Sequence, residues 1–237
     1  MTATSEKSPD LTRPASENSG WYVYAVCRDL DANALDGSLG LGGMPVELVH
    51  DDELTAVVSS VPLLEYGPEA LRHNLVDPAW LDRAVHVHDQ VVSLVAALAA
   101  TVPVRLATVC PDDDAVRARL RDWRIPLVCT LDRVEGCAEW RVKVVSTGNA
   151  RADETVAKSI HSALSGLAVS TRELGVEDAR LSGHSGVIEL NAAYLVPFDV
   201  GEAFATRIAQ LAADGQDVVV DGRGPRPPYA FAMLAEP

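Results

Sequence analysis

The sequence predicts an α+β protein of two domains, an N-terminal mixed α+β domain followed by one with the element order β-α-β-β-α-β. The prediction rests on two observations. An amphipathic helix that begins at Trp80 leads into apolar, β-rich sequence after Pro103, which supplies the centre of the first domain. After Gly136, short alternating segments and longer helical ones follow in the order given above. We therefore expect a disordered tail over residues 1–20, a first domain over 21–137 and a second over 138–237.

Composition and charge disfavour several classes of protein. The 237 residues have a formal net charge of −14, and the 20 Lys and Arg are scattered, which disfavours binding to nucleic acid or anionic lipid. The longest apolar run, residues 91–100, is too short for the ~20 residues that span a bilayer. Residues 1–20 are polar and lack the apolar core of an export signal, so the sequence indicates a cytoplasmic protein.

Three strands are expected at the start of the first domain. Residues 21–27 are aromatic and β-branched, and residues 46–49 and 54–61 have a similar character. The polar residues 51–53 fit a hairpin connection between the second and third strands. These segments predict a small antiparallel unit.

The central helix is predicted from apolar residues that recur at steps of three and four. They are Leu81, Ala84, Val85, His88, Val91, Val92, Val95 and Leu98. Such spacing places them on one buried stripe. Pro103 lacks the N–H that a helix interior needs, so the helix should end near Thr101, and residues 104–109 should continue as a strand.

One apolar segment has no regular period. Leu63, Leu64 and Tyr66 lie between Pro62 and Pro68, where regular structure is not expected. Two interpretations remain for this segment. It folds back as a lid on the core, or it forms an exposed apolar patch that binds a partner.

An acidic triplet opens the next predicted helix. Residues 111–114 read Pro-Asp-Asp-Asp and precede helical sequence up to Trp123. Carboxylates in the first turn of a helix are favoured by its dipole and caps, so we prefer this interpretation to a cation site. A further apolar segment over residues 125–134 leads to Gly136.

The second domain is predicted from alternating and helical segments. Residues 139–145 alternate, with Trp140, Val142 and Val144 on one face and Glu139, Arg141 and Lys143 on the other, as in a half-buried strand. A helix is marked by Val156, Ile160, Leu164, Leu167 and Leu174, and we expect it to end at Gly175.

The rest of this domain completes the order. Residues 187–196 form the next strand, paired with residues 180–183 across a turn at 184–186. A second helix contains Phe204, Ile208 and Leu211 and closes at Gly215, and residues 217–221 supply the last strand. This order is that of the ferredoxin-like fold, which indicates little about function by itself.

No catalytic, cofactor or metal signature is present. His86 and His88 point to different sides of the helix, and His88 is expected to be a hydrogen-bonded core residue. The run Gly183-His184-Ser185-Gly186 lacks the final glycine of a nucleophile elbow and is interpreted as a turn. The four cysteines form no C-x-x-C pair, which indicates free, buried thiols; they are Cys27, Cys110, Cys129 and Cys137.

Six segments together resemble one protein family. They are YVYA at 22–25, the run from HNL at 73–75 through WL at 80–81 to His88, PVRLAT at 103–108, EWRVK at 139–143, NAAYLV at 191–196, and GP at 224–225 with PPYAF at 227–231. In this order they resemble the gas vesicle synthesis proteins of the F/L type. The resemblance spans residues 21–231.

The resemblance implies a function that the residues alone do not. It implies a non-enzymatic accessory protein, without a cofactor, that binds the small hydrophobic gas vesicle shell protein and other gas vesicle accessory proteins. Leu63, Leu64 and Tyr66 are then the candidate partner-binding residues. Two alternatives from other classes are an enzyme that uses a cleft between the domains and a sensor that binds a small molecule on the ferredoxin-like sheet.

Overall fold

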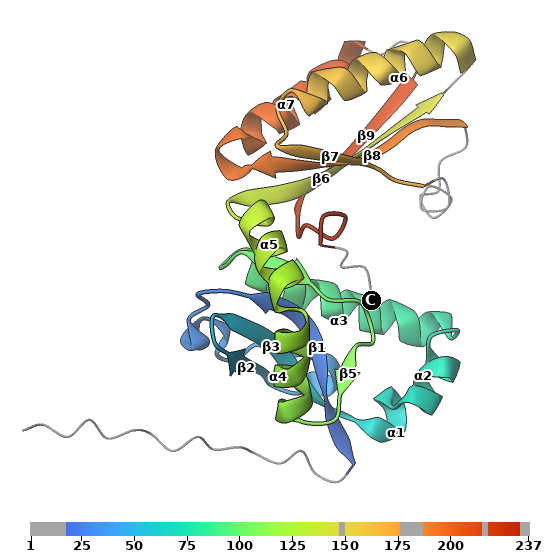
Figure 1. Ribbon diagram of the computed structural model, residues 1–237. Helices are drawn as coiled ribbons and strands as arrows, with labels where there is room; N and C mark the ends of the chain where they lie inside the picture. The colour runs from blue at the N-terminus through green and yellow to red at the C-terminus, as the bar shows by residue number, and fades with distance from the viewer. Residues whose placement is uncertain (1–17, 147–149, 176–186, 215–217, 233–237) are drawn as a thin grey trace, which may run out of the picture.

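The structure is a computed structural model, and it describes residues 18–146, 150–175, 187–214 and 218–232. It contains two antiparallel sheets with helices packed on them (Figure 1). The fold is therefore mixed α+β, as the sequence predicted. The predicted tail lies almost entirely outside the described residues, although Ser19 and Gly20 already belong to the first strand.

The first sheet is built around strand β1 (Ser19–Cys27). Its order is β2-β3-β1-β4, with β2 at Val46–Asp51, β3 at Leu54–Pro62 and β4 at Thr101–Pro103. Strand β5 (Val109–Cys110) pairs with the other end of β1. The predicted hairpin between β2 and β3 is present, and its turn places Asp52 at a φ of 57°.

Both faces of β1 are buried, because helices cover the first sheet on both sides. Tyr22 and Tyr24 face α3 (Pro78–Ala96), whereas Trp21 and Val23 pack with residues of the helices on the opposite side. Those helices are α4 (Asp113–Asp122) and α5 (Arg124–Val134). The remaining short elements of this half are η1 (Ala32–Leu35), η2 (Leu41–Gly43), α1 (Leu63–Tyr66) and α2 (Pro68–Asn74).

The buried stripe of α3 is narrower than predicted. Its buried residues are Trp80, Ala84, His88, Val91, Val92 and Val95. Val85 is 46% exposed and Leu98 48%, so these two assignments were wrong. Val85 is exposed because it lies outside the face of α3 that the sheet contacts, and Leu98 is exposed because it follows the end of the helix at Ala96.

The strand predicted over residues 104–109 is wrong. The chain pairs with β1 at β4, leaves the sheet, and pairs again at β5. Between them Ala107 has a φ of 64°, which is incompatible with an extended strand, and its N–H donates to the Tyr22 hydroxyl at 3.0 Å. A tertiary contact with β1 therefore replaces the regular ladder here.

The acidic triplet caps α4, as predicted. Asp112 is the N-cap residue, and its carboxylate accepts from the Ala115 N–H at 2.8 Å. Asp113 has a further role, because it accepts from the indole Nε1 of Trp21 at 2.6 Å. The apolar segment that follows forms α5.

The second sheet has the order β7-β8-β6-β9, and its elements follow one another as β-α-β-β-α-β. The strands are β6 (Cys137–Ser146), β7 (Ser170–Glu173), β8 (Val187–Pro197) and β9 (Val218–Arg226). Helices α6 (Ala150–Ser165) and α7 (Gly201–Asp214) pack on one face, with the turn η4 (Phe198–Val200) before α7 (Figure 1). The element order is the predicted one.

Two boundaries in this half were predicted wrongly, because β9 continues to Arg226 beyond the predicted end at residue 221, and the first helix is shorter than predicted. The first helix ends at Ser165 and not at Gly175, because Val169 donates to the Leu195 carbonyl and the chain enters β7. Leu174 therefore lies outside the helix. Strand β7 is the hairpin partner of β8. The partner predicted at residues 180–183 and the turn at 184–186 lie outside the described residues.

Strand β6 was predicted to expose one polar face, and Glu139 contradicts this. Glu139 is 0% exposed. Its Oε2 accepts from the Ala230 N–H at 2.6 Å, and its Oε1 accepts from Arg141 Nε at 2.8 Å. Arg226 Nε lies 3.8 Å from the same oxygen. The strand alternates as predicted, but its second face is covered at Glu139 and stays partly exposed at Arg141 and Lys143.

The cover is residues 227–232, which we call the closing segment. In Figure 1 it is the dark red coil between the two sheets. Tyr229 donates to Asp89 of α3 at 2.9 Å, and Arg133 of α5 donates to the Phe231 carbonyl at 2.7 Å. Arg172 of β7 donates to the Ala230 carbonyl at 2.7 Å. The closing segment thus contacts both halves, and we still propose a domain boundary near Gly136.

We predict that Val95→Asp destabilises the protein far more than Leu94→Asp. Val95 is 0% exposed and Leu94 is 38% exposed, so only the first variant buries an unpaired charge. The expected losses of unfolding free energy are at least ~3 kcal/mol for Val95→Asp and under ~1 kcal/mol for Leu94→Asp. Denaturant melts measure both, and equal losses would show that the stripe is misassigned.

A second prediction concerns Glu139. Glu139→Gln should lower the unfolding free energy by about 2–3 kcal/mol, because the charged acceptor of one buried and one partly buried hydrogen bond is lost. Glu135→Gln is the matched control, since the Glu135 side chain is 69% exposed and lies 3.6 Å from Arg28 in a surface ion pair. Chemical denaturation measures the difference. Similar small losses in both variants would contradict the role given to Glu139.

Candidate functional site

The three predicted partner-binding residues lie on α1, and they are not equally accessible. Leu64 is 92% exposed, Leu63 is half-buried, and Tyr66 is only 5% exposed. The Tyr66 ring lies 5.5 Å from the Trp80 ring and 6.0 Å from the Tyr22 ring, measured between centroids. Tyr66 therefore belongs to the core, as the lid interpretation expected, and Leu64 alone is freely available for a partner.

The segment forms one helical turn, although no regular structure was expected there. Gly67 donates to the Leu63 carbonyl at 2.8 Å, and a Cβ on Gly67 would lie 2.4 Å from that oxygen, so this position requires glycine. Glu65 holds the turn against its neighbours. Its carboxylate accepts from Trp80 Nε1 at 2.8 Å, and its carbonyl accepts from Asn74 Nδ2 at 2.9 Å. Leu64 is thus presented on a rigid support.

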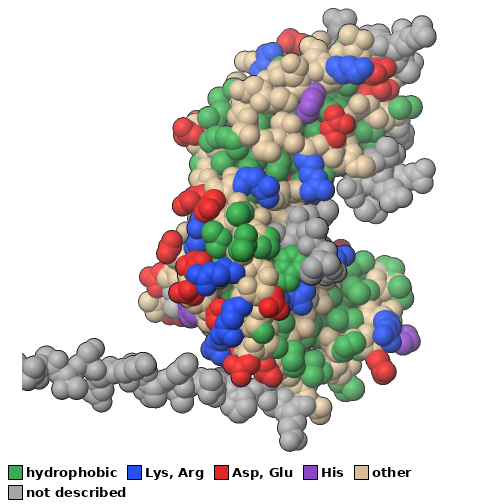
Figure 2. Space-filling view, in the orientation of Figure 1, with side chains coloured by type: hydrophobic (Ala, Val, Ile, Leu, Met, Phe, Trp, Pro, Cys, Tyr) green, Lys and Arg blue, Asp and Glu red, His purple; other side chains and the backbone are tan. Residues whose placement is uncertain are grey.

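Other apolar side chains are exposed on the same half of the molecule. Figure 2 shows hydrophobic side chains gathered over α3 and towards α1 and α2. Four exposed large apolar residues lie here. Leu75 is the C-cap of α2, Val76 follows it, and Val85 and Leu94 belong to α3. Exposed apolar groups of this kind indicate a contact with another macromolecule when they are grouped.

His88 is part of a buried polar chain in the core beneath α3. It is 4% exposed, and its Nδ1 lies 3.0 Å from the Tyr22 hydroxyl. Burial lowers the pKa of His88 to about 4, although the nearby Asp89 acts in the opposite direction. The same burial raises the pKa of Tyr22, of Tyr24 and, to about 12, of Tyr66. His88 is therefore a hydrogen-bonded core residue, as predicted.

The described part of the chain contains no group of three His, Cys, Asp or Glu side chains suited to a metal. His86 is exposed and its Nε2 lies 2.9 Å from Gln90 Nε2, on a different side of α3 from His88. All four cysteines are free, as predicted, but only Cys27 and Cys110 are buried; Cys129 is exposed, so the expectation of a buried thiol was wrong there. Burial raises the pKa of the Cys27 thiol to about 12, which makes this group a poor nucleophile. No helix among the described residues is long and apolar enough to span a membrane.

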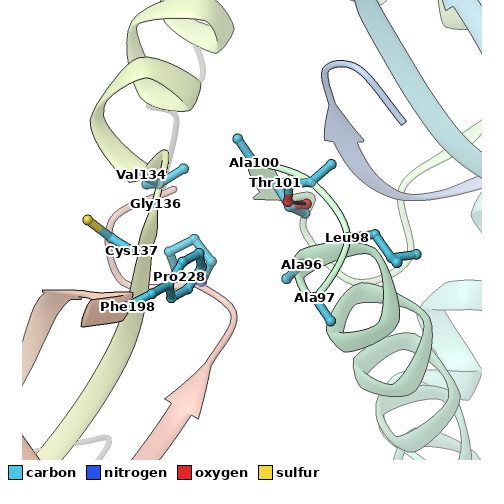
Figure 3. A pocket seen from close by; sticks show the side chains of 11 residues that line it. Ala96, Ala97, Leu98, Ala100, Thr101, Val134, Gly136, Cys137, Phe198 and Pro228 are labelled. Atoms are coloured by element: carbon cyan, nitrogen blue, oxygen red, sulfur yellow. Dashed lines mark hydrogen bonds between the residues drawn. The ribbon is translucent and has the colours of Figure 1, made fainter. Parts of the chain in front are cut away.

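Two hollows lie at the end of the second sheet, and both are lined by Phe198. The first, of about 180 Å³, lies between the end of α3 and the start of β6. In Figure 3, Ala97, Leu98 and Thr101 form one side of it, and Cys137, Phe198 and Pro228 form the other. The second, of about 280 Å³, is lined by Ala138, Trp140, Val196, Pro197, Phe198, Gly201, Glu202, Ala205 and Pro225. We call the two hollows together the Phe198 surface.

Sequence reasoning missed both Phe198 and Glu139. Phe198 directly follows a strand and belongs to no periodic segment. Its position as a large apolar residue outside every predicted element was the one feature of the sequence that could have indicated an exposed anchor. It is 62% exposed. Glu139 fits the polar face of an alternating strand, and no local pattern shows that a segment ninety residues later covers it.

Comparison with known proteins relates both halves of the chain to one protein family. The family model described as "Gas vesicle synthesis protein GvpL/GvpF" matches residues 20–154 and 148–233. Gas vesicle protein L of Streptomyces sp. (strain CB03234) is 34% identical over 251 residues, covering 91% of this chain and 93% of the relative. Gas vesicle protein F2 of Halobacterium salinarum is 29% identical over 218 residues, covering 90% and 92%.

A solved structure has a similar fold. The crystal structure of the gas vesicle protein GvpF from Anabaena sp. PCC7120 superposes with a TM-score of 0.69 at 18% identity, covering 92% of this chain and 98% of that one. At this identity the likeness concerns the fold alone.

The buried histidine predicts a pH dependence of stability. Because the pKa of His88 falls from 6.5 to about 4 on folding, the unfolded chain binds more protons between these values. The stabilisation is complete above pH 6.5 and is lost as the pH falls towards 4, by up to ~3 kcal/mol. Denaturant melts of wild type and His88→Gln between pH 7 and 4 measure this, and identical pH slopes would contradict it.

Proposed function

The chain belongs to the gas vesicle synthesis protein GvpL/GvpF family, and from this premise we propose that it is a non-enzymatic accessory protein that binds the small hydrophobic gas vesicle shell protein. The observation that supports a gas vesicle role most directly is the match over both halves of the chain. Contacts with other gas vesicle accessory proteins form part of the same proposal.

Leu64 is the central residue of the proposed shell-protein contact. It is 92% exposed on a turn that Glu65 fixes to α2 and α3. The backbone of this turn therefore loses little conformational entropy when a partner covers Leu64. Burying apolar area contributes about 25 cal/mol per Å², and one leucine supplies at most ~3 kcal/mol. Tyr66 is excluded from the contact because it is already buried.

Charge supports the same proposal. A hydrophobic subunit that must be kept from aggregating benefits from a carrier of high net charge, and this chain has a formal charge of −14. Complexes that carry the same charge repel one another and stay dispersed.

The two alternative functions have weaker support. The hollows of about 180 and 280 Å³ are smaller than the ~300–1,000 Å³ of typical small-molecule sites. Neither hollow brings together a nucleophile and a base among the residues that line it. No specific observation therefore favours an enzyme or a sensor.

The proposal predicts that Leu64→Ser weakens capture of purified shell protein about tenfold, through lost apolar contact. Ile125→Ser is the matched control, because Ile125 is 77% exposed on α5, which covers the opposite face of the first sheet. Pull-down with wild type, Leu64→Ser and Ile125→Ser measures this. Full capture by Leu64→Ser would refute the surface, and no capture by wild type would refute the proposed binding.

A further inference from the structure

The Phe198 surface combines an exposed aromatic anchor with two adjoining apolar hollows. Phe198 is 62% exposed and lines both of them. Its backbone is fixed, because it begins the turn η4 and its N–H donates to the Gly136 carbonyl at 2.9 Å. On the far side of the first hollow, Leu98 is 48% exposed. A rigid aromatic side chain beside small hollows is the type of anchor that dominates binding energy at protein interfaces.

The charges next to this surface are negative. Asp199 and Glu202 follow Phe198 in the sequence and are both exposed, and among the described residues neither forms an ion pair. Glu202 lines the second hollow. Cys137 lines the first hollow but its sulfur points away from it (Figure 3), and burial and, to a smaller extent, the Asp199 carboxylate raise the pKa of this thiol.

The end of α3 adds to the negative potential. Residues 96–98 line the first hollow, and they include the last residue of α3 and its C-cap. The last turn of this helix contains no basic residue, so the negative end of the helix dipole at the first hollow is not neutralised by the helix itself. Two arginines of this region are directed elsewhere, since Arg226 Nε lies 3.8 Å from Glu139 Oε1 and Arg133 donates to the Phe231 carbonyl.

We propose that the Phe198 surface binds a positively charged amphipathic helix of another protein. Apolar side chains on one face of that helix enter the two hollows around Phe198, and its Lys or Arg residues meet Asp199, Glu202 and the end of α3. This contact lies at the end of the second sheet and involves none of the residues of α1, so it is separate from the shell-protein contact proposed at Leu64.

Charge complementarity selects this occupant over others. A second copy of the chain has the same net charge of −14 and the same acidic groups, which disfavours self-association at this face. The surface of an anionic membrane is disfavoured for the same reason. Because the hollows are small, they suit single side chains of a larger partner better than a whole small molecule.

The test uses the full chain and a labelled two-heptad peptide that has Leu at the core positions and Lys at the others. Fluorescence anisotropy should show binding of this peptide, and an analogue with Glu in place of Lys should not bind. Phe198→Ser should raise the Kd about tenfold. Ile125→Ser, which removes an exposed apolar side chain elsewhere, should leave the Kd unchanged.

A second variant keeps the test independent of any folding defect in Phe198→Ser. Asp199→Asn combined with Glu202→Gln changes two exposed side chains, and it should weaken binding and flatten its dependence on salt. Absence of peptide binding, an unchanged Kd in Phe198→Ser, or equal binding of the Glu analogue would each overturn the proposal. Self-association of the wild type that Phe198→Ser abolishes would identify a second copy as the occupant and overturn it too.

Discussion

The arrangement of the two sheets depends on one buried carboxylate. Glu139 lies in the strand that opens the second sheet, and it binds the backbone of the closing segment at Ala230. A buried carboxylate is tolerated only when its oxygens are paired, and Arg141 and Ala230 supply those partners. Because the closing segment also binds Asp89 and Arg133 of the first half, this interaction helps to hold both halves together.

Both candidate surfaces are consequences of this rigid framework. Leu64 is exposed because Glu65, Tyr66 and Trp80 fix the turn that presents it. Phe198 is exposed because its backbone is tied to Gly136 at the junction of α5 and β6. The first hollow exists only because the end of α3 and the end of the second sheet lie opposite each other (Figure 3). Preorganised apolar groups lose little entropy on binding, which suits the partner-binding role that we propose.

The chemistry of the molecule is consistent with this interpretation. The titratable groups with strongly shifted pKa values include tyrosines, cysteines and a histidine buried in the cores and the partly buried Tyr229 of the closing segment, and desolvation is the main cause in each case. Groups shifted in this way serve packing and hydrogen bonding when they do not converge on an accessible pocket. The exposed features are apolar side chains and acidic charge, which are the elements of recognition.

The sequence by itself determined the features that depend on local periodicity. It predicted the α+β class, the strands of the β2–β3 hairpin, the core position of His88 and the order of helices and strands along the second half, because alternation and helical spacing record which face is buried. It also indicated the family. Only the tertiary structure decided the environment of Glu139, Tyr66 and Ala107, because each contacts a partner remote in the sequence. Glu139 binds the closing segment, Tyr66 packs against α3, and the Ala107 N–H donates to the hydroxyl of Tyr22. The Phe198 surface was likewise invisible in the sequence, since a hollow is formed by segments that meet only when the chain has folded.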